Sequence, residues 1–290
     1  MATVAKPTVR STRDFRWERT LWQIAQYAVL IFFALVCIVP LIWVISSSFK
    51  SAREIALSPL GLPSSFTLKN YIQAWTVGRL SKYFGNSVIT SIPIVVGSVA
   101  LSSLAGYGFA RYKLPGGTIF FYMFLLGLMV PMQSIMIPLF YILRDVGFLG
   151  TYWAMIVPNI VLGLPFGIFF MRAFFMRLPE ELADAALIDG ANDLDVFWRV
   201  MLPLATPAIT AQIVFQFVWA WNSFLIPLIY VQKEELRPLV LGLMFFKSKY
   251  TQNIPLTMAG AAIVMLPMII IYIIFQRKFI QGMTSGAVKG

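Results

Sequence analysis

The acidic side chains of this otherwise apolar chain are concentrated in one short stretch. Six of the twelve carboxylates lie between residues 180 and 195, namely Glu180, Glu181, Asp184, Asp189, Asp193 and Asp195. Alanines and a glycine stand among them, and such small residues let the backbone of a partner come close. Like charges on the flank of a helix favour docking of a basic partner. The alternative is an ordinary acidic loop that joins two membrane helices.

Local signals in this stretch predict two short helices. Pro179 suits a first helical turn, because its missing N–H would be unpaired there in any case. The spacing of one helical face is followed by Leu182, Ala185, Ala186 and Asp189. Gly190 predicts the end of the first helix, and Asn192 predicts the cap of the second, with Asp195 reaching back to it. Pro203 is expected to close the second helix.

The spacing across the stretch resembles the cytoplasmic EAA loop of the permeases of ATP-binding-cassette (ABC) importers. That loop reads E-A-A, three residues, G, nine residues, I, one residue, L-P, and here Asp184-Ala185-Ala186, Gly190, Val200 and Leu202-Pro203 fit all the spacings. Asp184 replaces the usual Glu and Val200 the usual Ile. The resemblance implies a coupling helix that docks in a cleft of a separate ATP-hydrolysing subunit. The implied coupling residues are Asp184, Ala185, Ala186, Asp189, Gly190, Leu202 and Pro203.

Composition places the chain in the membrane. Hydrophobic residues make up 59%, charged residues 12%, and the mean hydropathy is +0.79, which is typical of a polytopic membrane protein. Six windows contain no Asp, Glu, Lys or Arg: 20–49, 83–110, 114–143, 146–171, 200–232 and 250–276. Each exceeds the roughly 20 residues that a helix needs to cross a bilayer. The sequence therefore predicts an all-α membrane protein with six transmembrane helices, and the resemblance implies the MetI-like permease bundle with its cytoplasmic coupling helix.

Six crossings place both termini on the same side. Basic residues in both tails, which are Lys6, Arg10, Arg13, Arg16, Arg19, Arg277, Lys278 and Lys289, favour the cytoplasm. With this orientation, thirteen basic residues of the whole chain lie on the cytoplasmic side and ten on the other side. Because this difference is small, the orientation rests on the tails and on the resemblance. We expect a cytoplasmic tail at 1–23, a permease domain at 24–276 with the coupling loop at 177–207, and a cytoplasmic tail at 277–290. The expected location is the cell inner membrane.

Amides and prolines inside the windows are candidates for a translocation path. Pro131 and Pro138 lie in the third window, and Pro158 and Pro165 in the fourth. Each proline leaves a backbone carbonyl unpaired, which a membrane helix tolerates where neighbours or a water-filled cavity satisfy it. The candidate path residues are Gln133, Asn159, Gln216 and Asn222. The alternative is a set of structural kinks buried between helices, and Trp near the end of a span is most often an interface anchor.

Three further stretches resemble carbohydrate permeases. Residues 106–113 resemble an A-Y-x-x-A-R turn, and 217–224 match F-x-x-x-W-N-x-F. The ending G-x-T-x-G-x-V-K-G looks like the tail of the smaller membrane subunit of maltose-type importers, where it lies against the ATPase dimer; this implies contacts through Thr284, Gly286 and Lys289. The resemblance implies import of a sugar or oligosaccharide. The implied partners are an ATP-hydrolysing dimer, a second homologous permease, and an extracytoplasmic solute-binding protein that the loop 232–255 approaches.

Missing residue types exclude several functions. The chain has no His and one Cys, Cys37, so it lacks the residues for a Cys or His metal site, for a disulfide within the chain and for Cys or His catalysis. No cofactor is expected. No G-x-x-x-x-G-K-[ST] occurs, so ATP hydrolysis is expected in a partner chain and this chain is not expected to be an enzyme. The charge-free windows count against a proton-coupled or sodium-coupled secondary transporter or channel. The basic and aromatic residues of 12–23 are interpreted as membrane anchors, not as a nucleic-acid site. The alternative that the chain belongs to an ABC importer of another neutral solute remains.

Overall fold

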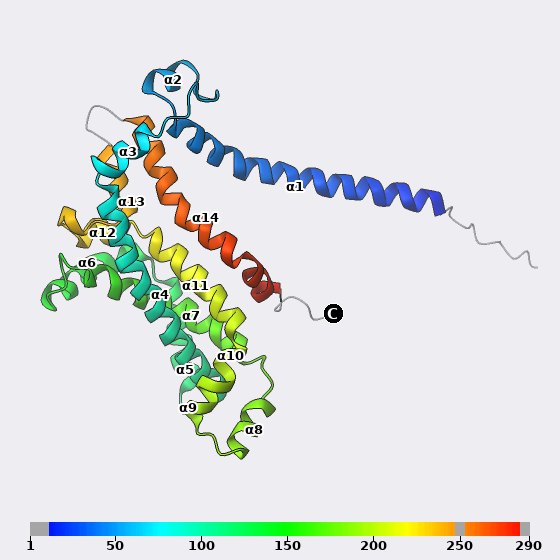
Figure 1. The fold of residues 1–290 in the computed structure, drawn as a ribbon. Helices are drawn as coiled ribbons and strands as arrows, with labels where there is room; N and C mark the ends of the chain where they lie inside the picture. The colour runs from blue at the N-terminus through cyan, green and yellow to red at the C-terminus, as the bar shows by residue number, and fades with distance from the viewer. Residues whose placement is uncertain (1–11, 247–252, 285–290) are drawn as a thin grey trace, which may run out of the picture.

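The computed structural model describes residues 12–246 and 253–284, and this part is helical with no strand (Figure 1). Five longer helices are α1 (Thr12–Ser48), α4 (Leu80–Arg111), α7 (Trp153–Phe175), α11 (Thr206–Trp221) and α14 (Ile254–Thr284). Shorter segments between them are α2 (Ala52–Leu57), α3 (Lys69–Thr76), α5 (Gly117–Leu126), η1 (Gly127–Met129), α6 (Met132–Asp145), α8 (Glu181–Ile188), α9 (Asp193–Asp195), η2 (Val196–Met201), α10 (Leu202–Leu204), α12 (Leu225–Tyr230), η3 (Glu234–Leu236), α13 (Leu239–Gly242) and η4 (Leu243–Phe246).

The helices confirm the predicted all-α membrane fold. Within the described residues, four continuous helices are long and apolar enough to cross a bilayer: Arg19–Ser48, Leu80–Arg111, Trp153–Phe175 and Ile254–Gln276. Two bent pairs supply the rest. Residues 117–129 and 132–145 meet at 104°, and 193–204 and 206–221 meet at 77°. Counting each pair as one span gives the six crossings that the sequence predicts.

The prolines of the third predicted span, 114–143, indicate a kinked helix, but the structure breaks this span into two helices at Pro131. Val130 is extended, with φ −78° and ψ 117°, and Pro131 stands at the N-cap of α6 instead of inside a helix. A residue before proline avoids the helical conformation, and proline has no N–H to continue the helix. The chain therefore turns sharply at Pro131.

The fifth predicted span, 200–232, is also interrupted. α11 ends at Trp221, Asn222 forms its C-cap, and α12 begins at Leu225. Residues of α12 then pack with Leu143 and Ala154 in a separate hydrophobic cluster. The crossing helix α11 is thus shorter than its charge-free window, and the chain that follows its C-terminal end packs against α7.

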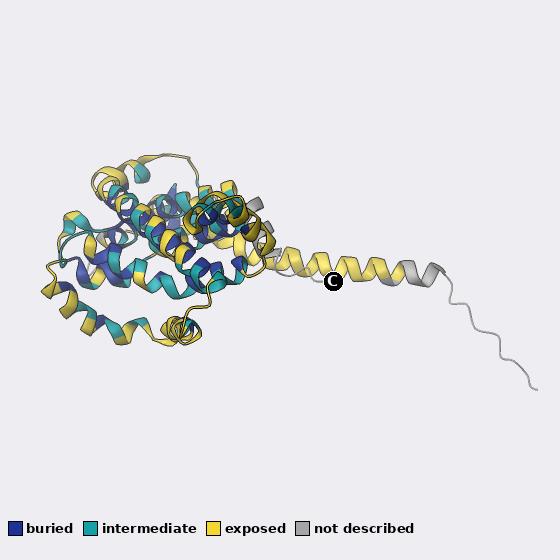
Figure 2. Cartoon of the chain, turned by 90° about the horizontal axis from the view of Figure 1, so that it is seen from below, coloured by how far each residue is buried: buried dark blue, intermediate teal, exposed yellow. Residues whose placement is uncertain are grey.

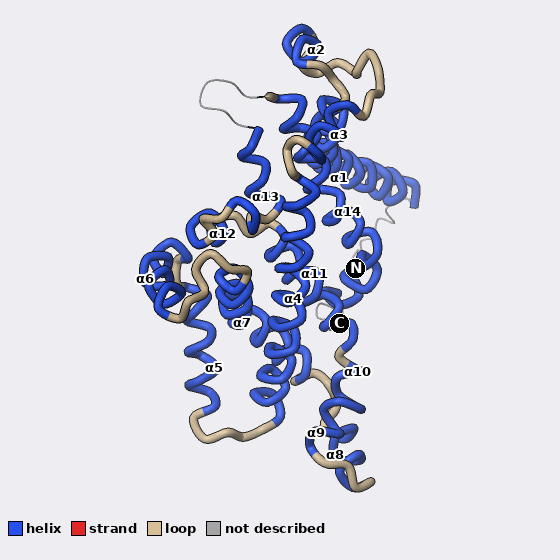
Figure 3. The backbone as a smooth tube through the Cα atoms, turned by 60° about the vertical axis from the view of Figure 1, so that its left-hand side comes forward, coloured by secondary structure: helices blue, strands red, loops and turns tan. Residues whose placement is uncertain are grey.

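Three helices, α4, α7 and α11, form the centre of the bundle and lie side by side (Figures 1 and 3). The small residues of α4 serve close packing, as the sequence predicts. At Gly106, an added Cβ would lie 2.7 Å from Met171 Cβ and 2.9 Å from the backbone N of Arg172. Only a glycine fits this contact, so the backbones of α4 and α7 approach closely there.

Helix α1 projects away from the bundle (Figure 1), and its residues 19–42 are all exposed (Figure 2). None of its most apolar 18-residue stretch is buried. It begins at Thr12, so residues 12–23 of the predicted tail continue the first helix. Such an apolar surface must face lipid or another membrane protein.

The end of the bundle opposite α8 is fixed by polar contacts. The Asn86 amide on α4 donates to the carbonyls of Glu235 (2.7 Å) and Arg237 (2.8 Å). The Tyr152 hydroxyl donates to Asn86 Oδ1 at 2.7 Å. The first part of the predicted loop 232–255 is therefore held against α4 and the start of α7, whereas 247–252 lie outside the described residues.

Candidate functional site

The acidic loop, residues 177–207, lies at one end of the molecule (bottom of Figures 1 and 3). Its first helix, α8, ends as the sequence predicts. Gly190 has φ +89°, its N–H donates to the Leu187 carbonyl (3.1 Å), and the Ala191 N–H donates to the Ala186 carbonyl (3.0 Å). These two bonds form a Schellman motif, which requires a left-handed residue at its centre. Glycine adopts that conformation at little cost.

The second helix of the loop begins at the predicted cap. Asn192 Oδ1 accepts a hydrogen bond from the Asp195 N–H at 2.9 Å. No capping box forms, because the Asp195 carboxylate pairs with Arg199 at 3.1 Å. The helix continues through a π-helical turn to Leu204, one residue beyond Pro203, and there it bends 77° into α11.

A hydrophobic cluster seats the loop on the bundle. Ala183 of α8 is buried, and half-buried Ala186 packs beside it. The cluster also contains Tyr107, Met171, Phe175, Val196, Phe197 and Met201. The small side chains of α8 therefore face the bundle, which leaves its opposite face open.

Arg111, the last residue of α4, joins the bundle to the start of α8. Its guanidinium donates to the Pro179 carbonyl (3.1 Å) and pairs with Glu180 (3.4 Å), and its side chain is 11% exposed. The next residue, Tyr112, lies near Asp193. Burial raises the pKa of Tyr112 to about 12, with smaller contributions from Tyr107 and Asp193.

Replacing Arg111 with alanine is expected to loosen the acidic loop. The change removes a charge-assisted hydrogen bond to the Pro179 carbonyl, worth about 1.5–3 kcal/mol, and a pair with the exposed Glu180 carboxylate, worth about 0–1 kcal/mol. Glutamyl endopeptidase should therefore cut after Glu180 or Glu181 several times faster. Arg79→Ala is the matched control, because Arg79 pairs with Glu234 on an exposed surface at the opposite end, where such a pair contributes about 0–1 kcal/mol. Equal cutting rates in both variants would show that Arg111 does not hold the loop.

The open face of α8 combines carboxylates with apolar side chains. Asp184, Ala185, Asp189 and Gly190 are all exposed there. Beside them Ile188 is 86% exposed, and Leu187 is exposed as well. Exposed apolar residues among charges mark a protein-docking surface. Ile188 was not among the predicted residues, although an isoleucine immediately before the carboxylate at the helix end was the available signal.

The other predicted coupling residues take different positions. Ala186 faces the bundle, and Leu202 is half-buried against the same hydrophobic cluster. Pro203 is exposed at the far end of the second helix. Thr284 is the last described residue, and Gly286 and Lys289 lie outside the described residues. The structure therefore gathers four of the predicted loop residues on one surface.

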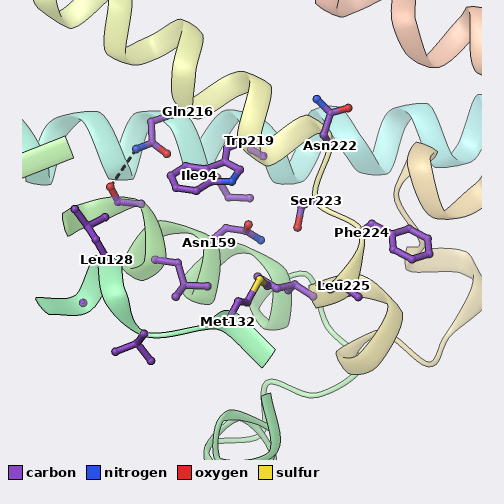
Figure 4. A pocket seen from close by; sticks show the side chains of 16 residues that line it. Ile94, Leu128, Met132, Asn159, Gln216, Trp219, Asn222, Ser223, Phe224 and Leu225 are labelled. Carbon is purple, nitrogen blue, oxygen red and sulfur yellow. Dashed lines mark hydrogen bonds between the residues drawn. The ribbon is translucent and has the colours of Figure 1, made fainter. Parts of the chain in front are cut away.

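A cavity of about 390 Å³ lies between α4, α7 and α11, closer to the opposite end (Figure 4). It is lined by Ile94, Gly127, Leu128, Val130, Met132, Asn159, Leu162, Gly163, Gln216, Trp219, Ala220, Asn222, Ser223, Phe224, Leu225 and Ile226. Three of the four predicted path residues, Asn159, Gln216 and Asn222, meet here. Gln133 does not line the cavity, because the chain turns at Pro131 and leaves Gln133 exposed on α6.

The amides of the cavity are held by backbone carbonyls. Asn159 donates to the Met155 carbonyl (2.7 Å), Gln216 to the Gly163 carbonyl (3.2 Å) and Asn222 to the Val218 carbonyl (2.9 Å). A primary amide has a second N–H and an oxygen with two lone pairs, so these held groups can still bind a ligand.

Trp219 adds an aromatic ring to this lining (Figure 4). Trp219 therefore lines a cavity in addition to lying near the end of a span, where an interface anchor is expected. None of the residues that line the cavity is ionisable. A ring beside amides, without charge, suits a neutral ligand with hydroxyl groups and apolar faces.

Comparisons with known proteins agree with this arrangement. Residues 83–285 match the family model described as "Binding-protein-dependent transport system inner membrane component". The chain is 36% identical over 265 residues (91% of this chain, 88% of the relative) to the diacetylchitobiose uptake system permease protein NgcG of Streptomyces coelicolor. It is 38% identical over 263 residues (89% and 94%) to the arabinooligosaccharides transport system permease protein AraQ of Halalkalibacterium halodurans.

A solved structure shares the fold. A chain of a bacterial ABC transporter involved in the import of the acidic polysaccharide alginate aligns with a TM-score of 0.77 at 24% identity, covering 94% of this chain and 100% of that one. The family match spans more than half of the chain, and both relatives exceed 30% identity over most of their length. The chain belongs to the family of inner membrane components of binding-protein-dependent transport systems.

Proposed function

We propose that this chain is the permease subunit of an ABC importer that carries a neutral sugar or oligosaccharide. The cavity carries this proposal: Asn159, Gln216 and Trp219 meet in a membrane bundle, in a lining without an ionisable residue. A saccharide offers hydroxyl groups to amides and apolar ring faces to an aromatic side chain. The names of the two relatives, which refer to diacetylchitobiose and arabinooligosaccharides, support a saccharide over another neutral solute.

The acidic loop is the proposed coupling element. Its open face presents Asp184, Ile188 and Asp189, and its other face is anchored to α4 and to the hydrophobic cluster. A partner ATPase that binds this face differently in its ATP-bound and free states would shift the bundle between inward-facing and outward-facing forms. In this proposal both termini and the acidic loop lie in the cytoplasm.

The remaining proposed partners follow from the rest of the surface. The exposed apolar side of α1 suits lipid and a second homologous permease. The opposite end, with the loop 232–255, would receive the extracytoplasmic solute-binding protein. The C-terminal residues Thr284, Gly286 and Lys289 are proposed to contact the ATPase dimer.

Uptake into proteoliposomes tests the proposal. The vesicles contain the complete importer and its binding protein, and the probes are radiolabelled diacetylchitobiose, a neutral arabino-oligosaccharide and an acidic alginate fragment. We expect at least one neutral probe to accumulate, and only when ATP is supplied to the complete importer together with its binding protein. The acidic fragment should not accumulate. Accumulation without the ATPase would establish a secondary transporter, and preference for the acidic probe would contradict the role given to the cavity.

A further inference from the structure

A buried polar cluster lies directly below the cavity, on the side of the acidic loop. Ser98, Ser102, Gly167 and Gln212 make up this polar cluster. Ser98, Gly167 and Gln212 each lie four residues, or one helical turn, from cavity-lining Ile94, Gly163 and Gln216 respectively. On α4, α7 and α11 alike, that turn leads toward the acidic loop.

The members of the polar cluster come from all three central helices. An added Cβ at Gly167 of α7 would overlap both Ser102 Oγ of α4 and Gln212 Nε2 of α11. Ser98 lies one turn from Ser102 on α4. Ser98, Ser102 and Gln212 are each 0% exposed. Helices α4 and α11 therefore direct the Ser102 hydroxyl and the Gln212 amide toward Gly167 of α7, where the backbones approach closely.

None of these polar side-chain atoms is satisfied within the described residues. Both amide atoms of Gln212 and the hydroxyls of Ser98 and Ser102 have no hydrogen-bond partner there. Burying an amide or a hydroxyl without a partner is unfavourable, and an apolar side chain of similar size would be more stable at such a place. Packing alone thus gives no reason for glutamine at position 212.

One hydrogen bond lies between the cavity and the polar cluster. Gln216 Nε2 donates to the Gly163 carbonyl at 3.2 Å, and both residues line the cavity floor (Figure 4). An added Cβ at Gly163 would lie 2.7 Å from Gln216 Oε1, so the side chain lies directly against the α7 backbone. Separation of α7 from α11 would break this bond and connect the cavity with the polar cluster.

We propose that the polar cluster is a second binding station for the transported saccharide, which it occupies after leaving the cavity toward the acidic-loop end. The station rests on the proposed function. A saccharide hydroxyl both donates and accepts, and it would complement the Gln212 amide and the Ser102 hydroxyl. Gly167 leaves room for a solute there once the helices separate. The polar side chains then obtain partners in the transporting state that they do not have in this one.

Gln212→Leu is the decisive variant, measured in the complete reconstituted importer with the saccharide that the wild type carries. We expect uptake to fall by about tenfold or more, since each lost hydrogen bond to a buried amide weakens binding substantially. ATP hydrolysis stimulated by the loaded binding protein is expected to persist, because the acidic loop is untouched. The melting temperature of the purified variant should stay equal or rise, because an unpaired polar group has been removed.

Two serine variants provide a matched pair. Ser102→Ala is expected to reduce uptake several-fold. Ser47→Ala should leave it unchanged, because Ser47 is also fully buried with an unpaired hydroxyl but lies at the end of α1, far along the chain from the polar cluster. Equal effects of the two changes would overturn the proposal.

The outcomes separate this inference from the function on which it rests. If wild-type vesicles take up no saccharide, both are overturned. If the wild type transports and Gln212→Leu transports equally well, the second station alone is overturned. Loss of uptake together with a lowered melting temperature would assign Gln212 a structural role and would also overturn the station.

Discussion

Replacing Gly190 with valine is expected to abolish ATP-driven uptake, a fall of about a hundredfold or more, while the chain still inserts into the membrane. Gly190 has φ +89°, and a β-branched residue in that region costs about 1–3 kcal/mol. Apart from its two chain neighbours, no described residue has an atom within 4 Å of an added Cβ, so the effect comes from the backbone and not from a clash. Relief of the strain would unwind the end of α8 and displace Ile188 and Asp189 from the docking surface.

Gly147→Val is the matched control for this change. Gly147 has φ +74° and equally open surroundings, but it lies between α6 and α7 at the opposite end. The strain introduced is comparable, so a general loss of stability would affect both variants alike. We expect uptake close to wild type for Gly147→Val. Normal uptake by Gly190→Val would remove the coupling role of the acidic loop.

Replacing Asn159 with leucine is expected to reduce uptake by about ten- to a hundredfold, because a lost bond to a ligand costs about 1–3 kcal/mol in a buried site. Asn159 is half-buried on α7 and lines the cavity beside Trp219. Its bond to the Met155 carbonyl is local to the same helix, so the fold should tolerate leucine. Initial uptake rates over a range of saccharide concentrations measure the effect, with ATP hydrolysis measured in parallel.

Gln133→Leu serves as the control for Asn159→Leu. Gln133 is an amide close to a proline in the neighbouring window, but it is exposed on α6 and does not line the cavity. Its replacement should leave uptake unchanged. If both variants lose uptake equally, or if neither does, the cavity is not the path that we assign to it.

Local signals in the sequence predicted the parts of the site that depend on a few neighbouring residues. Gly190 ends α8 because only glycine readily adopts φ +89°, and Asn192 caps the next helix with its own side chain. Both effects act within one helical turn. The apolar windows likewise identified the membrane helices, because length and composition decide whether a helix can cross a bilayer.

Features that depend on distant packing could not be read in the same way. Pro131 predicts a kink in 114–143 but not a bend of 104°, so the sequence pattern groups Gln133 with residues that it does not join. Trp219 has the same local pattern as an interface anchor, and only the return of the chain through Ser223 and Phe224 makes it part of a cavity lining. Exposure of Ile188 depends on which face of α8 meets the bundle, and contacts with Phe197 and Met201 decide that.

Thiol labelling of the acidic loop tests the central claim most directly. Cys37 is the single cysteine, so Asp189→Cys in a Cys37→Ser background places one thiol on the docking surface. A membrane-impermeant maleimide should not label it in intact cells, should label it in inside-out vesicles stripped of the ATPase, and should label it much more slowly once the ATPase subunit is added back. Labelling from outside intact cells, or labelling in vesicles that the ATPase leaves unchanged, would contradict the docking of this loop on a cytoplasmic ATPase.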